Sequence, residues 1–283
     1  MKKNLWLKLI SVLLIMASMI TLVACSAGEE EGGSDSASDS GNASDVTNLG
    51  PRAEDFVPSA NLTFEANAKK TAYQLKSASK CKDAEVVIPS TYTGADGITL
   101  PVTTILGGAF DGNKTAVTVY IPDSVTKISG ADEKKNIPGA FSGAEALTRV
   151  VCGSGLTEIG TKAFEDCDNL KSIELKEGIT TISGYAFAGC KSLESIVIPD
   201  TVTQLGASCF QRCLGLRSVT IGKKVKSIGK YCFYYCNNIV SVNYTGTKSD
   251  WAKLKVDVSC FLSVTITRVV ECSDGTYDLP NLT

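Results

Sequence analysis

The sequence predicts a mainly β solenoid of about seven 23-residue coils, with short strands on one face and turns or short helical turns on the other. Two observations predict this fold. Apolar residues recur at a fixed step of 23 from Phe141 to Ile239, and each unit holds one short alternating stretch of the kind that forms a strand. A unit of this size cannot bury its own apolar face, whereas stacked units can.

The chain begins with a basic segment followed by an apolar run. Lys2, Lys3 and Lys8 come before or at the start of the run from Leu9 to Ala24, which is shorter than the ~20 apolar residues that span a bilayer. This pattern predicts a signal peptide over residues 1–24.

The end of the run, Leu22-Val23-Ala24-Cys25, resembles the lipobox of bacterial lipoproteins. The resemblance implies cleavage before Cys25 and acylation of Cys25. Its acyl chains would bind the membrane with ~0.8 kcal/mol per buried methylene. The alternative is an ordinary signal peptide followed by an incidental cysteine.

The residues after Cys25 predict a tether. Residues 26–60 carry eight acidic side chains and one arginine, with few large apolar residues, so they cannot offset the entropy lost on ordering. We expect a disordered acidic Ser/Gly/Asp linker over residues 25–60 and a folded domain over residues 61–283. With a lipid on Cys25, this order places the domain in the bacterial cell envelope, lipid-anchored and facing the exterior.

The folded part has balanced charge and no histidine. Residues 61–283 carry 24 basic and 22 acidic side chains, so nothing in their charge indicates a nucleic-acid partner. The lack of histidine removes the commonest general base, the histidine-activated nucleophiles and the histidine zinc sites. We therefore predict that the chain is not an enzyme and needs no cofactor; acid–base chemistry by paired carboxylates is the catalytic alternative.

Four columns define the repeat, whose motif is L-x-x-I-x-I-x-x-x-[IV]-T-x-I-G-x-x-[AC]-F-x-x-C-x-x-L. The columns are Phe141, Phe164, Phe187, Phe210 and Phe233; Leu147, Leu170, Leu193, Leu216 and Ile239; Ile159, Ile182, Leu205 and Ile228; and Cys167, Cys190, Cys213 and Cys236. Phe110 begins the array one unit earlier, after an edge coil that contains Val86 to Pro89. At the other end, Cys260-Phe261 forms a decayed last unit.

This period and motif resemble the leucine-rich repeats of BspA-like bacterial surface proteins over about residues 72–279. The segment from Val86 to Ile105 resembles the first coil of that family, and Tyr244 to Trp251 resembles part of its C-terminal closure. The resemblance implies a leucine-rich-repeat solenoid and a function in adhesion to a host or neighbouring-cell protein or glycan. A structural or spacer surface lipoprotein without a dedicated ligand is the alternative.

Most of the eleven cysteines fall in repeat columns that hold alanine or asparagine in other units. Such positions accept a small buried side chain, and free cysteine behaves as one. We therefore expect a mostly reduced core, although an exported protein invites disulfides. Cys260 and Cys272 form the candidate disulfide pair, and metal binding by the C-x-x-x-C pairs at Cys209 and Cys232 is the alternative for those residues.

Strand residues that point away from the core form the candidate ligand face. They are Tyr120, Arg149, Val151, Ser172, Glu174, Ser195, Val197, Ser218, Thr220, Ser241 and Asn243. Solenoids bind along extended surfaces of this kind, and the shallow, uncharged serine column suits an extracellular protein or a glycan. Tyr120 and Arg149 are the main anchors, because aromatic residues and arginine carry much of the energy of interfaces. The alternative is that these columns only keep the sheet soluble and stacked.

Overall fold

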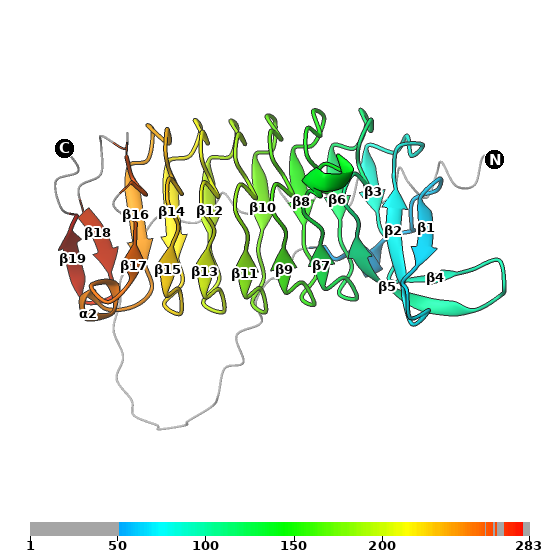
Figure 1. The fold of residues 1–283 in the computed structure, drawn as a ribbon, viewed down its shortest axis with the longest axis horizontal. Helices are drawn as coiled ribbons and strands as arrows, with labels where there is room; N and C mark the ends of the chain where they lie inside the picture. Colours follow the sequence, from blue (N-terminus) through cyan, green and yellow to red (C-terminus); the bar gives the residue numbers. More distant parts are fainter. Residues whose placement is uncertain (1–50, 258, 263, 265–268, 280–283) are drawn as a thin grey trace, which may run out of the picture. The chain divides into compact units, whose positions relative to one another are not determined.

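Successive coils of the chain each contribute one strand to each of two rows (Figure 1). The computed structural model describes residues 51–257, 259–262, 264 and 269–279, all within the unit Leu49–Thr283. The predicted signal peptide, Cys25 and the first part of the predicted linker lie outside the described residues. No helix in the part of the chain that the structure describes is long and apolar enough to cross a membrane.

The first row contains the strands that the repeat motif predicts. They are β3 (Glu85–Val87), β6 (Thr118–Tyr120), β8 (Arg149–Val151), β10 (Ser172–Glu174), β12 (Ser195–Val197), β14 (Ser218–Ile221), β16 (Ser241–Tyr244) and β18 (Val269–Cys272). Neighbours in this row pair in parallel, except that no pairing joins β10 to β12 in the described residues, so the row consists of two sheets. The antiparallel strand β19 (Gly275–Asp278) closes the second sheet.

The second row was not expected, because the segment by which each unit returns after its first strand (the return arm, Thr180 to Gly184 in one unit) was predicted to turn on its glycine. Its strands are β1 (Thr63–Ala66), β2 (Tyr73–Ser77), β5 (Thr99–Ile105), β7 (Lys127–Ile128), β9 (Glu158–Ile159), β11 (Thr181–Ile182), β13 (Gln204–Leu205), β15 (Ser227–Ile228) and β17 (Lys255–Val256), with β4 (Thr91–Thr93) paired to β5. A threonine ladder runs beside this row, since the hydroxyl of Thr180 donates to the carbonyl of Thr157 and that of Thr203 to the carbonyl of Thr180. These bonds link equivalent positions of adjacent coils.

Three short helices complete the described elements. They are η1 (Ala53–Asp55), η2 (Glu133–Lys135) between β7 and β8, and α2 (Lys248–Trp251) near the C-terminal closure. A reciprocal capping box between Thr247 and Asp250 begins α2, which explains why so short a helix forms.

Stacked phenylalanines fill the core, as their column predicts. Phe110, Phe141, Phe164, Phe187, Phe210, Phe233 and Phe261 lie in sequence with adjacent ring centroids 4.3–5.4 Å apart. From Phe141 to Phe233 the planes of neighbouring rings differ by at most 5°. Each of these rings is almost fully buried, so the stack joins the coils into one continuous core.

The buried cysteine column also forms hydrogen bonds. The thiol of Cys190 donates to the carbonyl of Phe164 at 3.2 Å, and Cys167, Cys213 and Cys236 make the equivalent bond to the preceding coil. In the first unit Asn113 takes this position, and its amide donates to the carbonyls of Ala78 and Cys81. The column therefore selects a small buried side chain, and where this is cysteine or asparagine it also donates to the preceding coil.

The candidate disulfide between Cys260 and Cys272 is not formed, because each of the two is a free thiol. Cys260 is fully buried and lies in the column of Cys209 and Cys232, with its side chain hydrogen-bonded to that of Cys232. Cys272 lies instead on β18, where its partner across the sheet is Gly275. The spacing of the two cysteines in the sequence did not reveal that they belong to different parts of the last coil.

The described residues begin at residue 51, ten residues before the expected start of the folded domain. Residues 51–59, which we call the strap, include η1 and pack over the first row at β3, β6 and β8. The ring of Phe56 packs against that of Tyr120 in a tilted arrangement, with ring centroids 4.6 Å apart. The linker prediction failed for this stretch because its one aromatic residue finds an apolar surface that lies far away in the sequence.

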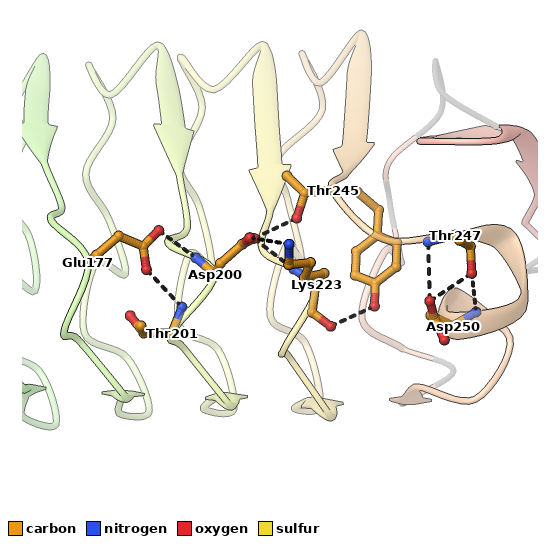
Figure 2. Close-up of polar contacts among 8 residues, drawn as sticks. Glu177, Asp200, Thr201, Lys223, Thr245, Thr247 and Asp250 are labelled. Atoms are coloured by element: carbon orange, nitrogen blue, oxygen red, sulfur yellow. Dashed lines mark hydrogen bonds and ion pairs between the residues drawn. The ribbon is translucent and has the colours of Figure 1, made fainter. Parts of the chain in front are cut away.

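A series of carboxylates links the corners that follow the strands of the first row (Figure 2). The carboxylate of Glu177 accepts from the backbone N–H groups of Asp200 and Thr201. Asp200 in turn accepts from the N–H of Lys223 at 3.0 Å and from the hydroxyl of Thr245 at 2.6 Å. Each acid thus accepts from backbone N–H groups of the next coil, and Asp200 also accepts from a hydroxyl two coils further on.

The Asp200 carboxylate makes the stability of the solenoid sensitive to acid. The Thr245 hydroxyl, followed by the N–H and ammonium of Lys223, holds the pKa of Asp200 below its ordinary value. A lowered pKa in the folded state stabilises the fold above the unfolded pKa, about 3.9 for aspartate, and this contribution is lost as the pH falls through the folded pKa.

We expect Asp200→Asn to destabilise the protein at pH 7 by roughly 1 kcal/mol, because a hydrogen bond to a charged group is replaced by a neutral one. Urea unfolding at several pH values between 7 and 3 should show a smaller loss of stability in acid for this variant than for the wild type. Glu194→Gln is the control, since Glu194 is exposed on the surface. An unchanged acid profile in Asp200→Asn would contradict the assignment.

Candidate ligand face

The candidate ligand face is the outward side of the first row. Along each strand a buried residue separates two outward ones, as Ile173 separates Ser172 from Glu174 and Ile196 separates Ser195 from Val197. Parallel pairing aligns these positions from coil to coil.

The register confirms that the predicted columns are in fact columns. Ser172 pairs with Arg149 and Glu174 with Val151. In the second sheet the aligned sets are Ser195, Ser218 and Ser241, and beside them Val197, Thr220 and Asn243.

Exposure is greatest at the middle of the face. Ser172, Glu174, Ser195 and Val197 are all exposed, and Val197 keeps 60% of its surface in contact with solvent. These four residues come from β10 and β12, the two strands between which the sheet pairing is interrupted. The centre of the face therefore offers an apolar side chain next to a carboxylate and two hydroxyls.

The remaining predicted residues on the second sheet are half-buried. Ser218, Thr220, Ser241 and Asn243 lie on β14 and β16, and the hydroxyl of Ser241 donates to that of Ser218 at 3.0 Å. This part of the serine column is therefore partly satisfied internally, whereas the exposed Ser172 and Ser195 are more accessible to a partner.

The prediction that Tyr120 and Val151 are accessible is wrong. Tyr120 is 2% and Val151 6% exposed, because the strap covers them and forms a small second cluster with Ala53 and Phe56. Arg149, which was predicted beside them, is half-buried at the edge of this cluster. Burial raises the pKa of the Tyr120 hydroxyl, and Glu85 adds to this while Arg149 opposes it.

The charges at the centre of the face are few. The carboxylate of Glu174 is paired with the ammonium of Lys176 on its own coil. None of the ion pairs between described residues includes Arg149. Among the described residues, the guanidinium of Arg149 is therefore not held in an ion pair and can bind an external acceptor. The carboxylate of Glu174, in contrast, is already paired with Lys176.

The buried thiols of Cys152 and Cys167 do not resemble nucleophiles, whereas at the fully buried Cys232 the effect of burial is outweighed by hydrogen bonds with the side chains of Cys209 and Cys260, which lower its pKa to about 5. Burial raises the pKa of Cys152 and that of Cys167 to about 12, whereas a reactive cysteine needs a lowered pKa. Within the described ranges, no group of three histidine, cysteine, aspartate or glutamate residues is arranged to hold a metal ion. The cysteines of the pairs that suggested a metal site, Cys209, Cys213, Cys232 and Cys236, are all fully buried in the core.

A tyrosine cluster on the turns of one late coil was missed. Tyr234 lies between Tyr231 and Tyr235, with ring centroids 5.2 and 4.2 Å away, and the ammonium of Lys230 lies 4.7 Å from the ring centroid of Tyr231. Tyr235 is 41% exposed. The run Tyr231-Cys-Phe-Tyr-Tyr235 was a visible signal, but it was used only to define the core column.

Comparisons with known proteins agree with this architecture. Residues 135–253 match the model of the BspA type leucine-rich repeat region, in six copies. A leucine-rich cell surface protein from Faecalibacterium prausnitzii has a similar structure, with a TM-score of 0.61 and 23% sequence identity. The match covers 77% of this chain and 54% of that protein.

A leucine-rich repeat protein from Eubacterium ventriosum is similar to the same extent, with a TM-score of 0.57, 23% identity, and coverage of 77% of this chain and 55% of that one. The chain thus spans about half the length of both proteins. A search of curated proteins gave no match. The fold is therefore a leucine-rich-repeat solenoid, and residues 135–253 within it are similar to BspA-type repeat regions.

Proposed function

We propose that the protein is displayed on the bacterial surface, anchored by a lipid on Cys25, and that it binds an extracellular protein or glycan through the outward side of the first row. The exposed Val197 at the centre of the face carries this proposal. Val197 is an apolar side chain on a strand, beside a carboxylate and hydroxyl columns, and it leaves 60% of its surface open to a partner.

The comparisons support the same proposal. A protein with a similar fold is described as a cell surface protein, and residues 135–253 resemble repeats of the BspA type. Extended solenoid faces commonly bind partners. Adhesion is the function that agrees with display on the cell surface and with a broad, shallow face.

The face is tested with the chain from residue 26 onward, which keeps the strap, on an array of extracellular-matrix proteins and glycans. We expect a saturable partner, and we expect the triple variant Arg149→Ala, Glu174→Ala, Val197→Ser to bind it at least about 30-fold more weakly. Loss of one central contact worth ~2 kcal/mol would already have this effect.

A matched control variant changes Gln204 and Lys226 to alanine, because both are exposed near the second row. Thermal melts establish that each variant is folded. If the triple variant binds as tightly as the wild type, the site is elsewhere, and the tyrosine cluster is the next candidate. If no array member binds saturably, the adhesive function is contradicted and the spacer alternative gains.

The anchor has its own test. When the whole chain is expressed in a bacterium, we expect it in the membrane fraction, whereas a Cys25→Ala variant should leave that fraction, because acylation needs the thiol. Metabolic labelling with a radioactive fatty acid should mark only the wild type. Equal membrane association without labelling in either chain would contradict lipidation at Cys25.

A further inference from the structure

The N-terminal end of the ligand face, which we call its head, is an apolar surface formed by Val87, Tyr120 and Val151. The chain covers this surface with its own strap. Val87, Tyr120 and Val151 are at most 6% exposed, and they occupy consecutive coils of one outward column, aligned by the pairing of β3, β6 and β8. The same column continues with the exposed Glu174 and Val197. Without the strap, this column would present apolar side chains on its first three coils.

The strap binds this surface through three kinds of contact. The ring of Phe56 packs on that of Tyr120. The carboxylate of Glu54 accepts from the backbone N–H of Asp123 at 3.0 Å. At Ser59, the N–H donates to the carbonyl of Val87 at 2.9 Å, and the hydroxyl accepts from the N–H of Val87 at 3.0 Å.

The hydrogen bond between the Glu54 carboxylate and a backbone N–H is of the same kind as one that adjacent repeats form with each other. Glu177 accepts from the N–H of Asp200 in the next coil, and Glu54 does the same for Asp123 although it belongs to no coil. The N–H of Asp123 is thus a donor near the N-terminal end of the repeats, and it donates to a carboxylate that belongs to no repeat.

The strap itself is loosely held. Val57 is 82% exposed and Ala53 is the only buried strap residue among those described. The ion pair between Arg52 and Asp123 spans 4.0 Å, and both side chains are largely in solvent. Segments with so little buried surface open at low free-energy cost, whereas the surface below them is almost wholly apolar.

We propose that this surface is a binding site for an extended peptide that presents an aromatic side chain close to a carboxylate, and that the strap occupies the site in cis. The proposal rests on the proposed function, since it names a partner for the same face. The ring takes the place of Phe56 on Tyr120, the carboxylate takes that of Glu54 on the Asp123 N–H, and the main chain pairs with Val87. A glycan has no aromatic ring to take the place of Phe56 on Tyr120.

The test uses a synthetic peptide of residues 51–60 as the probe and the chain from residue 26 onward as the protein. The wild-type chain should bind the peptide weakly, because its own strap holds the site, and the fraction of open sites scales the apparent affinity. A Phe56→Ala chain, whose strap has lost its ring, should bind the peptide at least about tenfold more tightly. The same peptide with Phe56→Ala should not bind either chain.

The site is located by a second change in the Phe56→Ala chain. Tyr120→Leu keeps an apolar side chain but removes the ring, and it should abolish saturable binding while the thermal melt shows a folded protein. Val197→Ser in the same chain should leave peptide binding unchanged, because Val197 lies beyond the strap.

Two results would overturn the proposal: no saturable binding to a folded Phe56→Ala chain, or equal affinity of the peptide for that chain and the wild type. Neither result depends on whether the array yields a partner for the centre of the face. Peptide binding at Tyr120 without any array partner would leave the inference standing and reject adhesion through the centre. If instead a partner from the array no longer binds the triple variant, and the peptide binds neither chain, then adhesion through the centre stands and the peptide site is rejected.

Discussion

Phe187→Ala should destabilise the solenoid by about 3–5 kcal/mol, the usual cost of removing a large buried aromatic side chain. Phe187 is fully buried, and its ring lies between those of Phe164 and Phe210, with centroids at 5.1 and 5.3 Å. Because the stack continues through the array, a gap at its centre removes contacts from both neighbouring coils. Urea unfolding followed by circular dichroism measures the effect.

Phe187→Leu serves as the comparison, since it retains most of the apolar volume and should cost clearly less. The unfolding transition of Phe187→Ala is also expected to broaden, because stability in a repeat array depends on the interfaces between neighbouring units. A loss below about 1 kcal/mol in Phe187→Ala would contradict the continuous stack as the main link between coils, since core truncations of this kind cost several times more.

Gly206→Ala should cost about 3 kcal/mol, at the upper end of the range for overpacking. A Cβ atom at Gly206 would lie 2.2 Å from the backbone nitrogen of Gly184 and 2.5 Å from the carbonyl carbon of Ser183. Both atoms belong to the backbone of the preceding coil, so no side-chain rotation relieves the clash. The two coils must separate at the point where their return arms pair.

The adjacent substitution Ala207→Ser is the control, because Ala207 is exposed and surface changes of this kind stay within about 0.5 kcal/mol. Thermal melts of both variants give the comparison. If Gly206→Ala has the same melting temperature as the Ala207→Ser control, the close approach of the coils does not limit which residue occupies position 206.

Much of the fold follows from the sequence, because a repeat turns a local pattern into a long-range contact. Once Phe164 and Phe187 are known to be equivalent, their stacking follows from the stacking of their coils. The same logic predicts the burial of Cys190, and the register of Ser195 on Ser218. The hydrogen bond from the thiol of Cys190 could not be predicted, since it depends on where the preceding carbonyl points.

The errors concern contacts outside the repeat. Tyr120 has the alternation of an outward residue, and only Phe56 makes it a buried one. Phe56 lies in a polar stretch without periodicity, so its partner is not encoded in any column. An isolated aromatic followed by Val57 in an acidic linker was the available signal. The return arms were missed because a two-residue strand such as Thr181–Ile182 is too short to show an alternating pattern.

The strap changes how the ligand face is understood. The predicted face ran from Tyr120 to Asn243, but its first part is covered by the segment that leads back toward Cys25. The accessible face therefore begins at Arg149 and is most open at Val197. A partner that binds the centre leaves the strap in place, whereas one that binds the head must displace it.

Hydrogen exchange with and without the array partner tests the central claim most directly, because it locates the contact without mutation. The account predicts that the bound partner slows exchange of amides in peptides covering residues 172–174, 195–197 and 218–221, while the second row is unchanged. Slowed exchange confined to the second row or to the turns around Tyr231 and Tyr235, with the first row unaffected, would contradict a ligand site on this face.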